Sequence, residues 1–287
     1  MKRREALTAL GGLALAACTR KPEQEPAPAT TTSTMPVVFA AHGAPPLLDD
    51  AGWMGELAAW AKAMQKPAGV LMVSAHWERR PATLGATSPV PLVYDFYGFP
   101  ARYYETKYAP PSSEALAGDV RELLRANALP FTDDPKRGLD HGAYVPLVAM
   151  YPAADVPILQ LSMPALDAPL LFRLGRALAP LRERGVLVFG SGFLTHNLAL
   201  RSAGVAQWAR EFDAWSEETL TRFDVDALMN FQTRAPAARI AHPTWEHYAP
   251  VLVAAGAASQ HSTPRVTFPI TGWWMNGPFT RRSVQLG

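Results

Sequence analysis

Three short apolar runs in this chain each lead into a segment that carries a histidine. Residues 37–41 precede His42, residues 70–75 precede His76, and residues 186–190 precede His196. Continuous apolar runs of this length predict buried strands, and the carboxyl ends of parallel strands meet at one edge of a sheet. Neutral imidazole is the commonest metal ligand among side chains. The pattern therefore predicts a metal centre at a strand edge.

The order of predicted elements determines the expected fold class. Strand-like runs alternate along the chain with segments of helical periodicity, and this is typical of an α/β protein. We expect one domain with a central, mainly parallel or mixed sheet and helices on both faces. Strands are expected at residues 36–41, 69–75, 82–86, 158–163, 186–190, 265–270 and 283–286, and helices at 49–64, 112–127, 167–185, 205–223 and 244–255.

Charge argues against a nucleic-acid partner. The formal net charge is +2, and residues 2–5 (Lys-Arg-Arg-Glu) account for all of it. The remainder of the chain is electrically neutral and lacks the excess of Lys and Arg that phosphate binding requires. We expect a small molecule rather than nucleic acid as the partner, and the sequence leaves the oligomeric state open.

The amino terminus has the features of an export signal. A basic start is followed by the apolar residues 6–17, which are too few to span a membrane and suit a signal peptide. Leu15-Ala16-Ala17-Cys18 resembles a lipobox, and Cys18 is the chain's single cysteine. The alternative is a plain secretion signal; the Arg3-Arg4 pair also resembles a twin-arginine signal. We expect a lipoprotein on the periplasmic side of a bacterial membrane, anchored through Cys18.

These signals divide the chain into three parts. Residues 1–17 are the expected signal peptide. Residues 18–35 are rich in Pro and Thr, cannot bury enough apolar surface to order themselves, and are expected to form a flexible tether. Residues 36–287 are the expected catalytic domain.

Single histidines are more often structural than catalytic, so each candidate is weighed by its context. Two histidines at one sheet edge favour a metal. His141 lies in LDHGAY, between a strand and a helix, and His247 lies in HPTWEHYAP, early on an expected helix. His242 and His261 have loop-like contexts, and we assign them no role.

Six segments, taken together and in order, resemble the DODA-type extradiol aromatic ring-opening dioxygenases of the class III, LigB-like superfamily. The resemblance runs from about Val37 to Gly287. The segments are GVLMVSAHWERR, DFYGFPARYYETKYAPP, GLDHGAYVPLVAMYPAADVPILQLSM, GSGFLTHNL, HPTWEHYAPVLVAAGA and SVQLG.

The resemblance implies a non-haem metal site. His42 and His76 match the first two ligands of the family motif, and His247 matches the third. His196 matches a histidine that is described either as the acid/base or as a further metal neighbour. The wider superfamily uses two His and one Glu, so Glu246 is the alternative third ligand; adjacent residues on a helix diverge by about 100°, so one of the two reaches the metal.

The resemblance also implies the reaction. Fe(II) is the expected cofactor for activity, with Zn(II) able to occupy the same site, and the substrates are O2 and a DOPA-like catechol. His196 would accept a catechol proton, with a pKa near the working pH. His141 would donate a hydrogen bond or a proton to the substrate.

Aromatic residues near these motifs are candidates for the wall of a substrate pocket. We expect Trp77, Tyr144 and Phe193 to contact the ring of the substrate. Two positions depart from the family pattern: Ala44 stands where Ser is frequent, and Tyr144 where Trp is frequent. Both bear on the choice of substrate rather than on the reaction.

Two other functions compete with a ring-cleaving dioxygenase. One is a zinc-dependent hydrolase on the same scaffold, and the other is a catalytically silent metal-binding lipoprotein. A metal binder needs neither His196 nor His141, whereas ring cleavage needs a base. The presence of both histidines favours the enzyme.

Overall fold

The computed structural model describes residues 34–201, 204–260 and 263–287. The expected signal peptide, Cys18, His261 and all of the expected tether except residues 34 and 35 lie outside these ranges. Among the described residues, no helix combines the length and the apolar character needed to cross a bilayer.

A mixed six-stranded sheet forms the centre of the described chain, with the strand order β5-β2-β6-β1-β10-β7. β5, β2, β6 and β1 are parallel, and β10 runs antiparallel to both β1 and β7. These strands are β1 (Val37–Ala41), β2 (Gly69–Ser74), β5 (Ile158–Gln160), β6 (Val186–Gly192), β7 (Val266–Ile270) and β10 (Ser283–Leu286). The predicted α/β class with a mixed sheet is confirmed.

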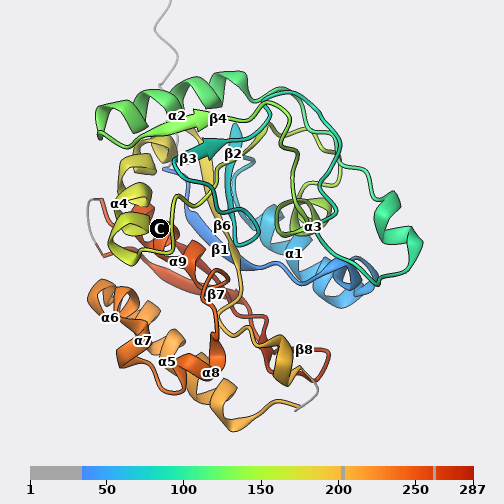
Figure 1. Ribbon diagram of the computed structural model, residues 1–287, viewed down its shortest axis with the longest axis vertical. Coiled ribbons are helices and arrows are strands. Elements are labelled where there is room, and N and C mark those ends of the chain that lie inside the picture. The colour runs from blue at the N-terminus through green and yellow to red at the C-terminus, as the bar shows by residue number, and fades with distance from the viewer. Residues whose placement is uncertain (1–33, 202–203, 261–262) are drawn as a thin grey trace, which may run out of the picture. The chain divides into compact units, whose positions relative to one another are not determined.

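Helices cover both faces of this sheet (Figure 1). The longer ones are α1 (Ala51–Ala63), α2 (Glu114–Ala126), α3 (His141–Met150), α4 (Ala168–Leu178), α5 (Gln207–Thr221) and α9 (Ala249–Ala258). Short helices α6 (Val225–Met229), α7 (Phe231–Arg234) and α8 (Ala238–Ala241) follow α5. In the described ranges, 3-10 segments lie at Pro45–Asp49, Ala101–Glu105, Ala179–Arg184 and Leu198–Leu200.

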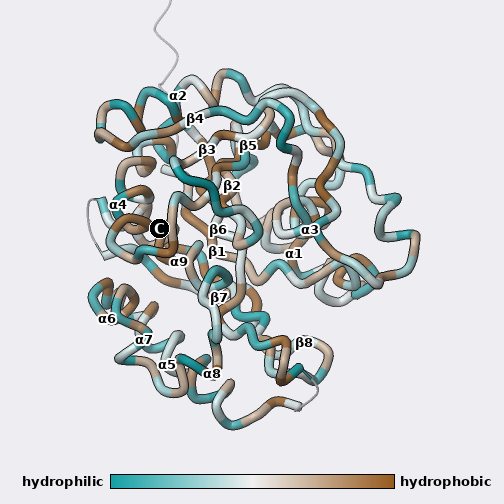
Figure 2. Tube along the Cα trace, viewed as in Figure 1, coloured by the Kyte–Doolittle hydropathy of each residue, from teal (hydrophilic) through white to brown (hydrophobic). Residues whose placement is uncertain are grey.

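Alternate residues of the central strands belong to two separate cores. Val37 and Phe39 pack in the core beneath α2, α4 and α9, whereas Val38 and Ala40 pack in the core beneath α1 and α3. Strands buried on both faces read as continuous apolar runs, which is the pattern seen in the sequence. Figure 2 shows the contrasting pattern of α2, where hydrophilic and hydrophobic residues alternate as they do in a helix with one face exposed.

Several elements differ from the expected ones. The strand expected at 82–86 exists as β3 (Ala82–Leu84), but it pairs with β4 (Phe131–Asp133) in a separate sheet. α3 was not expected, because it is buried on all sides and contains Pro146, so it lacks both amphipathic spacing and the usual helix composition. The helix expected at 244–255 begins only at Ala249, where Pro250 occupies its first turn.

The last described sheet is a hairpin formed by β8 (Trp273–Trp274) and β9 (Phe279–Thr280). Trp274 stacks on Phe193 with ring centroids 6.3 Å apart, and Phe279 lies 6.0 Å from the same ring. The hairpin therefore packs against the segment that follows β6.

Candidate metal centre

The register of the sheet brings the predicted histidines together. Ala41 at the end of β1 pairs with Gly192 at the end of β6, and Ser74 at the end of β2 pairs with Ser191. Three parallel strands thus end at one level. His42 directly follows the end of β1 and His76 lies two residues beyond the end of β2, so both lie at the same edge of the sheet, as the sequence predicted.

Gly192 brings the segment before α9 to this edge. A Cβ atom at this position would lie 2.1 Å from the carbonyl oxygen of His247, and the amide of Phe193 donates to that same oxygen over 2.9 Å. Glycine permits this close approach because it has no side chain. His247 therefore joins the site through a backbone contact that no local sequence pattern reveals.

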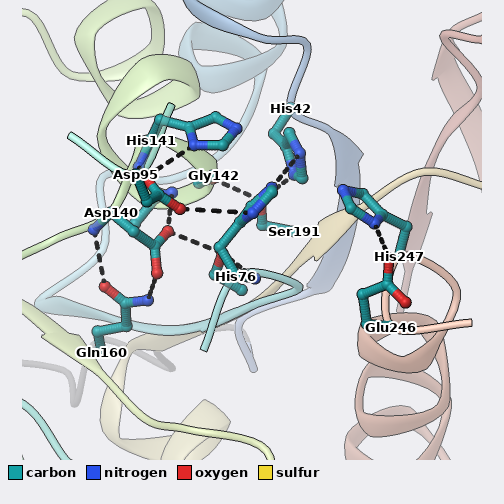
Figure 3. A network of polar contacts seen from close by, with 12 residues as sticks. His42, His76, Asp95, Asp140, His141, Gly142, Gln160, Ser191, Glu246 and His247 are labelled. Carbon is teal, nitrogen blue, oxygen red and sulfur yellow. Dashed lines mark hydrogen bonds and ion pairs between the residues drawn. The ribbon is translucent and has the colours of Figure 1, made fainter. Parts of the chain in front are cut away.

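Three imidazoles face a common space at this edge (Figure 3). The Nε2 atoms of His42 and His76 lie 3.1 Å apart, and one ring nitrogen from each of His42, His76 and His247 lies within 4.8 Å of the other two. Two nitrogens bound to one metal at about 2.1 Å would be separated by about 3.0–3.4 Å. The spacing fits a shared metal ion.

Polar contacts on the far side of each ring favour one of its two tautomers. Ser191 Oγ donates to the carbonyl of Gly142, so at 3.0 Å it accepts from Nδ1 of His42. Nδ1 of His76 lies 3.4 Å from a carboxylate oxygen of Asp95.

His247 is held in the same way as the other two rings. Its Nδ1 lies 2.9 Å from Glu246 Oε1, on the side away from the shared space (Figure 3). The hydrogen bonds of His42 and His247 favour a proton on Nδ1, and the carboxylate of Asp95 near Nδ1 of His76 favours the same tautomer, in which each ring presents the lone pair of Nε2.

Three lone pairs that converge without a proton between them repel one another unless a cation lies among them. Burial, followed by the charges of neighbouring histidines, lowers the pKa of His42 and of His247 well below the ordinary value. Burial, followed by the charge of His141, does the same for the pKa of His76. All three are therefore neutral at pH 7, which is the form that binds a metal. The residues present fit the metal that the sequence predicted.

His141 lies beside these rings at the first position of α3. Its Nδ1 is 2.8 Å from Asp95 Oδ1, and its ring centroid is 3.9 Å from that of His76. Burial opposes ionisation of Asp95, but the hydrogen bonds and charges of His141 outweigh it and lower the pKa of Asp95 to about 2. Asp95 is therefore ionised across the whole working pH range.

His196 lies against His247 rather than pointing at the same centre. The two rings stack with centroids 3.5 Å apart and planes 10° apart. A ring nitrogen of His196 lies within 4.8 Å of a Glu246 oxygen and of a His247 nitrogen, so these three residues form a second possible ligand group. Burial, then the charges of His242 and His141, lowers the pKa of His196 to about 3. The expectation of a pKa near the working pH is therefore not met, and His196 is neutral at that pH.

The three aromatic candidates occupy different places. Phe193 lies edge-on to His42, with centroids 5.2 Å apart, and so borders the histidine cluster. Trp77 packs under the guanidinium of Arg137 at 5.1 Å. Tyr144 is fully buried in the core beneath α1 and α3, where its ring lies 6.2 Å from Tyr94. Of the three, Phe193 has the position expected of a substrate contact.

A buried polar network anchors the start of α3 next to the metal centre. Asp140 caps the helix by accepting from the amide of Ala143 at 3.1 Å, and it also accepts from Ser74 Oγ at 2.8 Å. Arg137 and Gln160 donate to its other oxygen. The network ties α3, and with it His141, to the end of β2. Asp95, Asp140 and Ser191 were not among the predicted site residues; of the three, only Asp140 has a local signal, the helix-capping pattern before α3.

His242, to which the sequence assigned no role, is buried in an aromatic part of the core. Its Nε2 lies 2.9 Å from the carbonyl oxygen of Leu194, and its ring packs among Phe212, Phe231 and Tyr248. Burial lowers its pKa to about 4.

Comparisons with known proteins agree with this site. Residues 30–277 match the family model described as the catalytic LigB subunit of aromatic ring-opening dioxygenase. A 4,5-DOPA dioxygenase extradiol from Beta vulgaris is 42% identical over 233 residues, covering 78% of this chain and 87% of the relative.

Bacterial relatives extend the likeness over nearly the whole chain. A 4,5-DOPA dioxygenase extradiol from Escherichia coli K12 is 33% identical over 267 residues, covering 90% of this chain and 96% of the relative. The crystal structure of an uncharacterized protein from Escherichia coli K12 superposes with a TM-score of 0.73 at 32% identity. It covers 88% of this chain and 100% of that one.

Proposed function

The chain belongs to the LigB family of aromatic ring-opening dioxygenases and is an extradiol dioxygenase, an oxidoreductase; from this premise we propose that it opens the ring of a DOPA-like catechol beside its two hydroxyls. The names of the relatives support a catechol of this kind as the substrate. The convergence of three imidazole lone pairs at the sheet edge is the observation that carries the proposal.

His42, His76 and His247 hold the metal in this proposal, and the metal is Fe(II). A ferrous ion bound by three protein ligands would supply open positions for both catechol oxygens and for dioxygen, and would conduct electrons from the bound catechol to the oxygen. Glu246 is not a ligand in this account. It accepts a hydrogen bond from Nδ1 of His247 and so orients that ring, as carboxylates beside metal-bound histidines commonly do.

His196 serves as the base. Its ring is neutral and stacks on that of His247. A substrate bound to the metal that His247 holds would therefore lie close to His196. It accepts the proton that a catechol hydroxyl gives up on binding. His141 lies beside His76 and its Nδ1 is held by Asp95, so the lone pair of its Nε2 is available to the substrate, and it accepts a hydrogen bond from a catechol hydroxyl rather than donating one. Phe193 forms part of the wall against which the aromatic ring packs.

The experiment is anaerobic loading with Fe(II), followed by addition of O2 and a panel of catechols that includes DOPA. We expect one O2 consumed per catechol and the appearance of a yellow ring-opened product. Loading with Zn(II) is the matched control and yields no product, because zinc has no redox chemistry. Iron-loaded protein that consumes no O2 with any catechol would refute the proposed reaction, and hydrolytic activity of the zinc form would favour the competing enzyme.

We also propose that the protein is exported and lipid-anchored through Cys18. The basic start, the apolar stretch and the position of the single cysteine support this. Cys18→Ser should move the protein from the membrane fraction to the soluble periplasmic fraction. Continued membrane association of the variant would contradict a lipid anchor at this residue.

A further inference from the structure

We propose that Asp95 is a positioning residue with two separable effects: it orients His76 for metal binding and His141 for contact with the substrate. The proposal deepens the function proposed above and rests on it for the role of His141. Asp95 belongs to the segment between β3 and the 3-10 turn at Ala101–Glu105, far in sequence from both histidines' strands and helices.

The carboxylate of Asp95 lies between the two rings (Figure 3). Oδ1 accepts from Nδ1 of His141 at 2.8 Å and from the amide of the same residue at 3.1 Å. Oδ2 lies 3.4 Å from Nδ1 of His76. One side chain thus lies beside Nδ1 of His76, a candidate metal ligand, and beside Nδ1 of His141.

The backbone holds Asp95 in this place. The amide of Val93 donates to the carbonyl of Leu139 over 2.9 Å, and Val93 forms a parallel bridge with Asp140. The segment is therefore attached to the residues just before α3. Because His141 opens α3, the carboxylate and the imidazole are fixed to the same part of the fold.

A carboxylate suits this position because each of its two oxygens presents an acceptor to one of the rings. An ionised carboxylate has acceptors only, so it favours a proton on Nδ1 of each ring and leaves each Nε2 facing inward. An amide has one oxygen and one NH2 group. In Asp95→Asn, at least one ring would face a donor, and that ring would lose its preference for the inward lone pair.

This geometry predicts different consequences for the two rings. Loss of the preference at His76 weakens metal binding, since its Nε2 is one of three converging nitrogens. Loss at His141 leaves the metal in place and slows the reaction. Mutation of carboxylates that support metal-bound histidines lowers metal affinity or activity by about 10–100-fold.

The test is a double-mutant cycle with Asp95→Asn, His141→Gln and the double variant, measured at saturating Fe(II) and saturating catechol. We expect Asp95→Asn to lower kcat by about 10–100-fold in the wild-type background and to have little further effect when His141 is already Gln. A second full loss of kcat in the double variant would show that Asp95 does not act through His141.

Metal affinity is the independent readout and requires no turnover. In chelator competition with Zn(II), Asp95→Asn should weaken binding by about 10–100-fold, equally with and without His141. Unchanged affinity would overturn the effect on His76. Asp155→Asn is the matched control, because Asp155 is an exposed carboxylate paired with Lys66 and should alter neither quantity.

Imidazole tautomers can be read directly in the zinc-loaded protein by long-range proton–nitrogen NMR correlation. We expect His141 to carry its proton on Nδ1 in the wild type and to lose this preference in Asp95→Asn. A wild-type His141 with its proton on Nε2 would overturn the proposal. Since this measurement and the chelator competition need no substrate, they decide the role of Asp95 even if no catechol is cleaved.

Discussion

At the scale of single residues, the site consists of histidines whose Nδ1 atoms, on the side away from the shared space, each lie beside a polar side chain. Ser191 holds His42, Asp95 holds His76 and His141, and Glu246 holds His247. Without these partners each imidazole could present either a proton or a lone pair. The partners make the arrangement a ligand set rather than a group of neighbouring rings.

The contrast between His247 and Glu246 gives the first residue-scale prediction. His247→Ala should abolish stable metal binding, because it removes one of three ligands. Glu246→Gln should retain the metal with affinity weakened by about 10–100-fold, since it alters only the support of His247. Elemental analysis after gel filtration measures both. Metal retained in His247→Ala but lost in Glu246→Gln would identify Glu246 as the ligand.

His196 gives the second prediction at the scale of single residues. In His196→Gln we expect normal iron content and normal anaerobic catechol binding, with kcat lowered by about 10²–10⁴-fold because the proton acceptor is gone. Oxygen uptake at saturating catechol measures the change. Turnover equal to the wild type would exclude His196 as the base.

At the scale of elements, the sequence predicted those parts of the site that depend on strands. The apolar runs before His42 and His76 placed both at one edge, because parallel strands that end in register bring their next residues together. The arrival of His247 depends on a tertiary contact at Gly192, and α3 lacks helical periodicity because it is buried all round. These features arise from packing between distant segments, so local patterns do not contain them.

Gly192 gives an element-scale prediction. In Gly192→Ala the new Cβ would meet the carbonyl oxygen of His247, so the segment before α9 must move. We expect the free energy of unfolding to fall by about 1–3 kcal/mol and metal affinity to fall with it.

Gly55→Ala is the control, because Gly55 lies on an exposed part of α1 with open space around its Cβ position. That change should raise the free energy of unfolding by about 0.5–1 kcal/mol. Urea titration measures both variants. Equal stability and metal affinity in wild type and Gly192→Ala would contradict the role of this close approach.

At the scale of the whole molecule, burying many neutral imidazoles makes stability depend on pH. The pKa of His242 is lowered by burial to about 4 and that of His196 to about 3, against about 6.5 in an unfolded chain. Below pH 6.5 the unfolded chain binds protons that the native protein does not. Stability is therefore full above about pH 6.5 and decreases as the pH falls toward these lower values.

The metal-free protein should accordingly lose about 3 kcal/mol at pH 4 through His242 alone, with further losses from the other buried rings. Urea unfolding with excess chelator at pH values from 7.5 to 4 measures this. His242→Gln keeps a donor for Leu194 and should show a shallower slope. A flat profile between pH 6.5 and 4 would contradict the account of buried neutral histidines.

The most direct test of the metal centre is an anomalous difference map of the iron-loaded protein, collected at the iron absorption edge. We predict one strong peak within bonding distance of Nε2 of His42, His76 and His247. A peak between His76, Asp95 and His141, or between His196 and Glu246, would contradict the assignment of the three converging imidazoles as the catalytic metal site.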